Sequence, residues 1–210
     1  MYNPRPMNDL TQNALEISGV SKRYGSLSAL KQVDLNIRRG EFFGLLGPNG
    51  AGKSTLISII AGLTRMNSGS VSIMGHDSVS DFRNARRKLG VVPQELVFDP
   101  FFEVRDVLRI QAGYYGCGPE ALPWIDEMLE RLELDDKRNT TMRSLSGGMK
   151  RRVLIAQALV HKPPVVILDE PTAGVDVELR RSLWSFMRDL HKQGTTVVLT
   201  THYLEEAQEM

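Results

Sequence analysis

A glycine-rich run between two apolar segments is the part of this sequence best suited to do chemistry. It reads Gly47-Pro48-Asn49-Gly50-Ala51-Gly52-Lys53-Ser54-Thr55. Glycines at this spacing let the backbone curl tightly, so that its N–H groups and the start of the following helix face one place. Such a loop binds phosphate, while its lysine reaches the terminal phosphates and the next hydroxyl ligates Mg²⁺. The run therefore predicts a phosphate-binding loop with Lys53 on phosphate and Ser54 on the metal.

The segments on either side of the loop support this prediction. Residues 42–46 are apolar and are typical of a buried strand in a parallel sheet. After the loop, one face of a helix is predicted to carry Leu56, Ile59, Ile60 and Leu63. The fixed positions of the pattern recur by chance in on the order of 1% of chains of this length. The strand–loop–helix context disfavours an accidental glycine-rich turn, so we expect a nucleotide-binding protein.

Two adjacent carboxylates follow another apolar run, residues 164–168. Ligands of open α/β sheets bind at this end of the strands. Successive residues point in different directions, so the two carboxylates can take separate roles. We expect Asp169 to hold Mg²⁺ and Glu170 to polarise an attacking water. A solvated acidic turn is the alternative, and the phosphate-binding loop upstream disfavours it.

A serine followed by two glycines opens another predicted helix. Ser146 is suited to cap that helix, while Gly147 and Gly148 leave backbone N–H groups accessible at its positive end. From the residues alone, a second anion site and a plain helix cap are equally good interpretations.

The pattern of apolar residues predicts an α/β fold. Residues 14–20 and 30–37 are expected to form strands of an antiparallel sheet beside the nucleotide core, and residues 71–75 are expected to form another short strand. Strands at 42–46, 164–168 and 195–200 fit buried positions of a parallel sheet, and residues 89–92 are expected to form a further strand. We expect a helical subdomain at about 95–152 inserted in this core, and a loose leader at residues 1–13 before a single domain at 14–210.

Composition limits the function classes. The net charge of +1 gives no general attraction to nucleic acid, so no nucleic-acid partner is expected. No run approaches the roughly 20 apolar residues of a membrane helix. One cysteine, Cys117, excludes an internal disulfide and fits a reducing compartment. His76, His161 and His191 match no motif and are predicted to be surface residues.

The sequence strongly resembles the ATP-binding cassette (ABC) ATPases over essentially its whole length after the leader. Residues 47–54 match the Walker A loop, residues 165–170 match Walker B with its catalytic glutamate, and residues 145–149 match the family signature. Single residues match the Q-loop glutamine (Gln94), the switch histidine (His202), the adenine-stacking aromatic (Tyr24) and the D-loop, which reads Ala173-Gly174-Val175-Asp176.

The resemblance implies a P-loop NTPase core and a head-to-tail dimer that encloses two ATP molecules. Ser146 and Gly148 would then bind the γ-phosphate held by the other subunit, which explains a second anion site. His202 would contact the γ-phosphate of its own subunit, and Gln94 would connect Mg²⁺ or water to a membrane partner. The implied catalytic residues are Glu170, His202, Gln94 and Lys53; the metal ligands are Ser54, Gln94 and Asp169; and the nucleotide contacts are Tyr24, Gly47, Asn49, Gly50, Ala51, Gly52, Lys53, Ser54, Thr55, Gln94, Ser146, Gly147, Gly148 and Asp176.

Within the family, residues 145–152, 171–176 and 201–207 look like the ATPase subunits of ABC-2-type exporters. This resemblance implies a separate polytopic permease that sets the substrate, and a location on the cytoplasmic face of the cell membrane. One complete set of motifs permits a homodimer, and pairing with a different cassette is the alternative. Such ATPases continue past the switch histidine with further strands, so we expect a piece of a longer protein.

Two other classes of protein are alternatives. A soluble ABC ATPase of DNA repair or translation usually carries two cassettes or long coiled-coil or basic insertions, and this sequence has neither. An unrelated P-loop GTPase would carry an Asn-Lys-x-Asp guanine-reading motif, which is absent.

Overall fold

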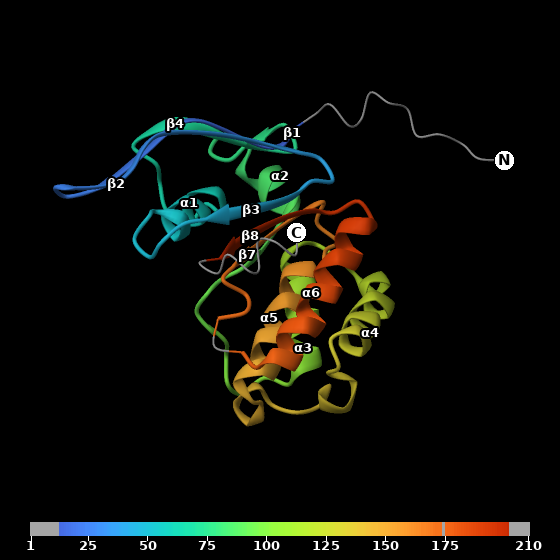
Figure 1. The fold of residues 1–210 in the computed structure, drawn as a ribbon. Helices are drawn as coiled ribbons and strands as arrows, with labels where there is room; N and C mark the ends of the chain where they lie inside the picture. Colours follow the sequence, from blue (N-terminus) through green and yellow to red (C-terminus); the bar gives the residue numbers. More distant parts are fainter. Residues whose placement is uncertain (1–12, 174, 202–210) are drawn as a thin grey trace.

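The structure is a computed structural model that describes residues 13–173 and 175–201. Two sheets lie one above the other with a helix between them, and a group of helices covers the far face of the lower sheet (Figure 1). In the described chain the upper sheet has the order β2-β1-β4-β5 and the lower sheet has the order β3-β8-β7-β6. The layers are therefore an antiparallel sheet, a parallel sheet and a helical layer.

The antiparallel sheet is built on the long strand β1 (Asn13–Tyr24), which pairs with β2 (Leu27–Arg38) and β4 (Ser68–Ile73). The short β5 (His76–Asp77) completes it. The predicted strand ended at Val20, but β1 continues to Tyr24 because its last residues pair with β2, Tyr24 lying opposite Leu27. The hairpin turns only at Gly25, which has a φ of 58°.

The parallel sheet places β7 (Val165–Asp169) between β6 (Leu89–Val92) and β8 (Thr196–Thr201). All residues of β7 are buried, as predicted for a central strand. The strand β3 (Phe42–Leu46) was also expected to be buried, but it is partly exposed. The reason is its place at the sheet edge, where β8 is its one partner among the described strands.

The described chain has five helices of eight or more residues: α1 (Lys53–Ile60), α3 (Val104–Tyr114), α4 (Leu122–Arg131), α5 (Gly147–Leu159) and α6 (Val177–Lys192). Short 3₁₀ turns lie at Pro119–Ala121, Asp135–Lys137 and Met142–Ser144. The predicted apolar face of α1 was wrong at one end: α1 stops at Ile60, and Leu63 is exposed. Among the described residues, none of the helices combines the length and the apolar character needed to cross a membrane.

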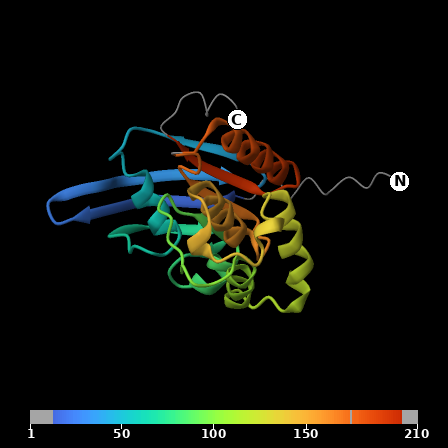
Figure 2. The same ribbon diagram turned by 90° about the horizontal axis from the view of Figure 1, so that it is seen from below.

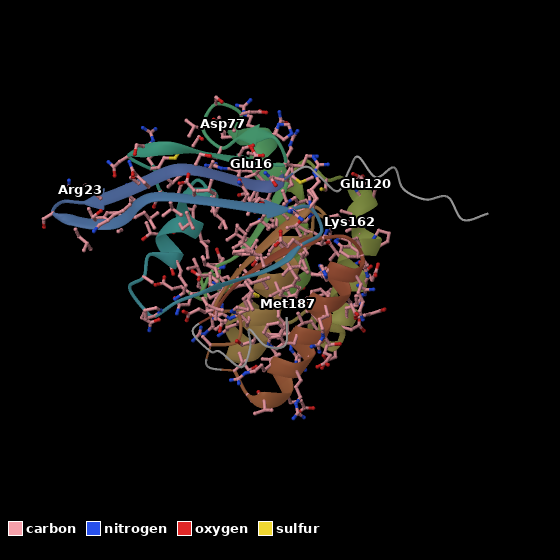
Figure 3. All side chains as sticks on the ribbon, turned by 45° about the horizontal axis from the view of Figure 1, so that its top comes forward. Glu16, Arg23, Asp77, Glu120, Lys162 and Met187 are labelled. Carbon is pink, nitrogen blue, oxygen red and sulfur yellow. The ribbon has the colours of Figure 1, made fainter. Side chains whose placement is uncertain are left out.

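The parallel sheet separates two hydrophobic cores. Alternate residues of β7 face opposite sides, so that Val166 and Leu168 join the core under α3, α4, α5 and α6. Val165 and Ile167 join the core formed with α1 and the antiparallel sheet. Figure 2 shows the same layers from below, and Figure 3 shows Met187 among the side chains of the helical core, with Arg23 at the opposite end of the molecule from Glu120 and Lys162.

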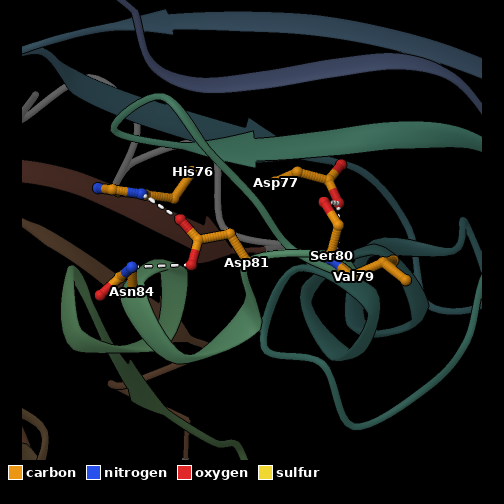
Figure 4. Close-up of polar contacts among 6 residues, drawn as sticks. All are labelled: His76, Asp77, Val79, Ser80, Asp81 and Asn84. Atoms are coloured by element: carbon orange, nitrogen blue, oxygen red, sulfur yellow. Dashed lines mark hydrogen bonds and ion pairs between the residues drawn. The ribbon is translucent and has the colours of Figure 1, made fainter.

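Two aspartates organise the connection from β5 to the short helix α2 (Phe82–Arg87). Asp81 accepts hydrogen bonds from Asn84 and from the ring of His76, the latter at 2.7 Å (Figure 4). Asp77 accepts from the backbone N–H and the hydroxyl of Ser80 and from the N–H of Val79. These bonds, led by the Ser80 N–H, lower the pKa of Asp77. The two carboxylates thus fix the turn that connects β5 to α2.

Candidate nucleotide-binding site

The loop between β3 and α1 adopts a conformation that only glycine permits at two positions. Gly50 and Gly52 have φ values of 82° and 92°. A Cβ on Gly52 would lie 2.7 Å from the carbonyl oxygen of Ala29 and 2.8 Å from a methyl group of Leu30. The loop can therefore press against β2 only without a side chain there, and it leaves a hollow in front of the first turn of α1.

Lys53 opens α1 and turns back over the loop. Its side chain is nearly buried, with 8% of its surface exposed. The Nζ atom donates hydrogen bonds to the carbonyl oxygens of Gly47 at 2.6 Å and of Pro48 at 3.1 Å. The ammonium group and the N-terminus of α1 thus place positive charge at the same spot. This arrangement suits a multiply charged anion.

One cavity brings most of the predicted site residues together. Its volume is about 430 Å³, within the range of small-molecule sites. Three segments far apart in sequence form it: the β1–β2 hairpin, the glycine-rich loop with the start of α1, and the ends of β6 and β7. The lining residues are Tyr24, Leu27, Ser28, Ala29, Asn49, Gly50, Ala51, Gly52, Lys53, Ser54, Thr55, Gln94 and Glu170. Tyr24 is half-exposed, and the ammonium of Lys22 lies 4.8 Å from its ring centre.

The ends of β6 and β7 supply the polar groups at the other side of the cavity. The amide Nε2 of Gln94 donates to Oε2 of Glu170 at 3.0 Å. Glu170 is nearly buried and has a φ of 48°, a left-handed conformation that is strained for this residue type. Its N–H group is held by Thr200, through the carbonyl oxygen at 3.2 Å and the hydroxyl oxygen at 3.0 Å. Two hydrogen bonds therefore maintain the strained turn.

Asp169 is the last residue of β7, and only 5% of its surface is exposed. Its Oδ1 accepts a hydrogen bond of 2.5 Å from the Thr200 hydroxyl. The three predicted metal ligands offer a hydroxyl, an amide and a carboxylate, all through oxygen, which is the set that Mg²⁺ prefers. No group of three or more His, Cys, Asp or Glu side chains in the described chain could hold a softer metal. The donor set present fits Mg²⁺.

Sequence reasoning missed a residue behind Gln94. Arg151 of α5 is buried, and its guanidinium donates to the carbonyl oxygens of Pro93 at 2.7 Å and of Gln94 at 2.6 Å. Burial lowers the pKa of Arg151, while the charge of Asp169 opposes that shift. The feature that could have pointed to Arg151 is its position in a helix whose other residues are mostly buried.

Some predicted residues lie elsewhere. Ser146 caps α5 by accepting from the N–H of Met149 at 3.2 Å, and Asp176 caps α6 by accepting from the N–H of Leu179 at 2.8 Å. Neither they nor the two glycines after Ser146 line the cavity described above. A Cβ on Gly148 would lie 2.7 Å from a methyl group of Leu179, so the starts of α5 and α6 are in contact. His202 and Gly174 lie outside the described residues.

Comparison with known proteins places the chain among ATP-binding cassettes. Residues 30–173 match the family described as ABC transporter. The Nod factor export ATP-binding protein I of Burkholderia thailandensis is 42% identical over 197 residues, which cover 93% of this chain and 65% of that protein. The chain thus spans less than two thirds of the length of that relative.

Two solved structures have the same fold. One is the ATP-binding subunit of an ABC transporter, which is 31% identical with a TM-score of 0.86 and covers 93% of this chain and 82% of its own. The other is a dimeric, post-hydrolysis state of an ATP-binding cassette bound to ADP and Pi. It is 30% identical with a TM-score of 0.83 and covers 93% of this chain and 90% of its own.

Proposed function

Because the chain belongs to the ABC transporter family, we propose that it binds and hydrolyses ATP as the energy-supplying subunit of an exporter. One observation carries this proposal: a single cavity is lined by the glycine-rich loop, an exposed tyrosine, and the hydrogen-bonded pair Gln94 and Glu170. Hydrogen-bond donors for phosphate, an aromatic ring that can stack on a nucleotide base and a carboxylate that can polarise water thus line the same cavity.

Each lining group has a role in this proposal. The adenine stacks on Tyr24, and the backbone N–H groups of the glycine-rich loop, in which Pro48 alone has none, hold the phosphates. Lys53 exchanges its loop carbonyls for the terminal phosphates. Glu170 polarises the attacking water, and Gln94 orients it. His202 would contact the γ-phosphate of the same subunit, as the family resemblance implies.

Ser54, Asp169 and Gln94 would hold Mg²⁺. The ion, when bound, neutralises charge on the phosphate oxygens of a loose phosphoryl transition state.

The nucleotide site is completed by a second copy of the chain. Ser146, Gly147 and Gly148 lie at the positive end of α5 but outside the cavity of their own subunit. In a head-to-tail homodimer they would meet the γ-phosphate bound by the partner, with Asp176 nearby at the start of α6. The similar cassette bound to ADP and Pi is dimeric, which supports this arrangement.

The subunit would work on a separate membrane protein. Relatives at about 40% identity carry the name Nod factor export ATP-binding protein I. We infer an ABC-2-type permease as partner, with this chain bound at the cytoplasmic face of the membrane. The permease would determine what is exported.

The proposal is tested by trapping the dimer with Glu170→Gln in the full-length protein. Without the carboxylate the bound water is not activated, so Mg-ATP should persist and hold two copies together. Size-exclusion chromatography with light scattering should give twice the monomer mass when Mg-ATP is added.

The matched control is Glu127→Gln, which makes the same change in an exposed ion pair with Arg131 on α4. This variant should hydrolyse ATP and return to monomer. A Glu170→Gln protein that binds ATP yet keeps the monomer mass would contradict the proposed dimer.

A further inference from the structure

The segment that carries Gln94 lies at the surface. Pro93, Gln94 and the next three residues are all exposed. The backbone hydrogen bond within this stretch is a short-range one, from the N–H of Val97 to the carbonyl oxygen of Glu95 at 3.1 Å. A segment of this kind needs an anchor if the Gln94 amide is to stay within 3.0 Å of Glu170.

Arg151 provides this anchor from inside the molecule. Its two terminal nitrogens each bond one of two successive carbonyl oxygens, those of Pro93 and Gln94. The planar fork of a guanidinium can serve two acceptors at once, and a charged donor makes such bonds stronger than neutral ones. Because the side chain is buried on α5, the anchor is as rigid as the helical layer.

We propose that Arg151 is a positioning residue for ATP hydrolysis, which fixes the backbone at Pro93 and Gln94 so that the Gln94 amide meets Glu170. This proposal rests on the proposed function of the same site. Arg151 does not line the cavity, so it acts through Gln94 and not on the nucleotide. The same helix begins at Ser146, so one rigid element connects the Gln94 segment to the surface that would meet the partner's nucleotide.

The next residue on α5 is a matched control. The guanidinium of Arg152 bonds the carbonyl oxygen of Leu132 at 3.2 Å and the carboxylate of Glu133 at 2.6 Å. These partners follow α4 and are not part of the nucleotide cavity. Arg152→Met therefore removes the same type of side chain from the same helix while the hydrogen bonds that hold Pro93 and Gln94 stay in place.

The first test is a double-mutant cycle in the full-length protein, with Arg151→Met and Gln94→Ala alone and together. Arg151→Met should lower the kcat for ATP by about tenfold or more, because a small misplacement of catalytic groups has such effects. The KM should change by less than about twofold. In the Gln94→Ala background, Arg151→Met should have little further effect, since the two residues act as one unit.

Arg151→Lys should recover part of the kcat, because one ammonium can still reach one of the carbonyl oxygens. Arg152→Met should keep the wild-type kcat. Full additivity of the Arg151 and Gln94 effects would overturn the proposal, as would equal losses of kcat in the Arg151→Met and Arg152→Met variants. If Arg151→Met fails to fold, Arg151→Lys takes its place in the cycle.

The second test needs no hydrolysis. Hydrogen–deuterium exchange of the nucleotide-free protein should speed up at residues 93–98 in Arg151→Met and at residues 130–134 in Arg152→Met. Unchanged exchange at 93–98 would overturn the anchor. If the wild-type protein does not hydrolyse ATP, the proposed function is refuted. The exchange experiment would still show whether Arg151 holds residues 93–98 in place.

Discussion

One hydroxyl group connects the two carboxylates of the site. Thr200 is fully buried on β8 and lies opposite Asp169 in the parallel register. Its hydroxyl donates to Asp169 and accepts from the N–H of Glu170. The hydroxyl has a single proton, which it donates to Asp169, so the hydroxyl orients the carboxylate of Asp169. Thr200 thus sets both the proposed metal ligand and the strained turn at Glu170.

Thr200→Val keeps the shape of the side chain and removes this hydroxyl. We expect a loss of about 1–2 kcal/mol in the free energy of unfolding, because buried polar groups lose a partner. The Mg²⁺ concentration for half-maximal ATPase rate should rise about tenfold, since an orienting contact to a ligand is gone. Titration of the rate with Mg²⁺ measures this.

Thr196→Val is the control at the other end of the same strand. There the hydroxyl accepts from the N–H of Gly40 at 2.9 Å, away from the site. It should lower stability similarly and leave the Mg²⁺ dependence unchanged. Equal Mg²⁺ dependence in the two variants would argue against the role given to Thr200.

Residue types and spacing predicted a site at the glycine-rich loop and at Glu170, because these residues lie in short, local patterns, whereas Tyr24 and Gln94 were implied by the family resemblance. The structure brings Tyr24, the glycine-rich loop, Gln94 and Glu170 together, and their individual roles stay predictions. Arg151 and Thr200 were missed, since their contacts join segments that the sequence does not place next to each other. Only the fold reveals such pairs.

Among the elements, His161 lies just after the end of α5 and is half-buried, although it was predicted to be a surface residue. The ring of His161 stacks on Tyr115 with 3.5 Å between ring centres, and its Nε2 donates to the carbonyl oxygen of Leu89. Its Nδ1 has no hydrogen-bond partner among the described residues. Burial lowers the pKa of His161 to about 4, although the bond to Leu89 acts in the opposite direction. The helix end is therefore joined to β6 by a neutral imidazole.

This shift predicts how stability depends on pH. The unfolded chain binds a proton at His161 near pH 6.5, but the folded protein does so only near pH 4. Lowering the pH through this window therefore favours the unfolded state. Between pH 7 and 4.5 the wild type should lose about 1–2 kcal/mol more than His161→Gln, a value reduced for partial exposure.

Urea unfolding of both proteins at several pH values measures the difference. His161→Gln should be the less stable protein at pH 7, and the gap should shrink as the pH falls. Parallel curves for the two proteins would contradict the assignment to His161.

Local patterns predicted which elements exist more reliably than where they end. The central position of β7 followed from its unbroken apolar run. The length of β1 and the partial exposure of β3 depend on strand pairing, which is set by the whole sheet. The end of α1 before Leu63 depends on a backbone turn at Gly62, whose φ is 71°.

For the whole molecule, the α/β fold with a parallel P-loop core and an antiparallel N-terminal sheet was predicted and is confirmed. Two cores on either face of one sheet explain why a chain of 210 residues can hold both a nucleotide cavity and a helical layer. The proposed division into a leader, a cassette and a helical subdomain stays a prediction. The proposed dimer rests on the signature residues Ser146, Gly147 and Gly148, which lie outside the cavity of their own subunit.

The partner of the whole molecule is best tested in its own host. Full-length protein, tagged at its native level, would be purified from membranes in mild detergent, and its partners identified by mass spectrometry. We expect a stoichiometric polytopic permease, because the proposed role of this chain is to supply energy to a separate membrane protein. Lys53→Ala should keep this partner while losing ATP binding, since Lys53 lies in the cavity and not on an outer surface. Recovery of the wild type with ribosomes or DNA-repair factors instead would refute the transport role and leave the ATPase chemistry of the site intact.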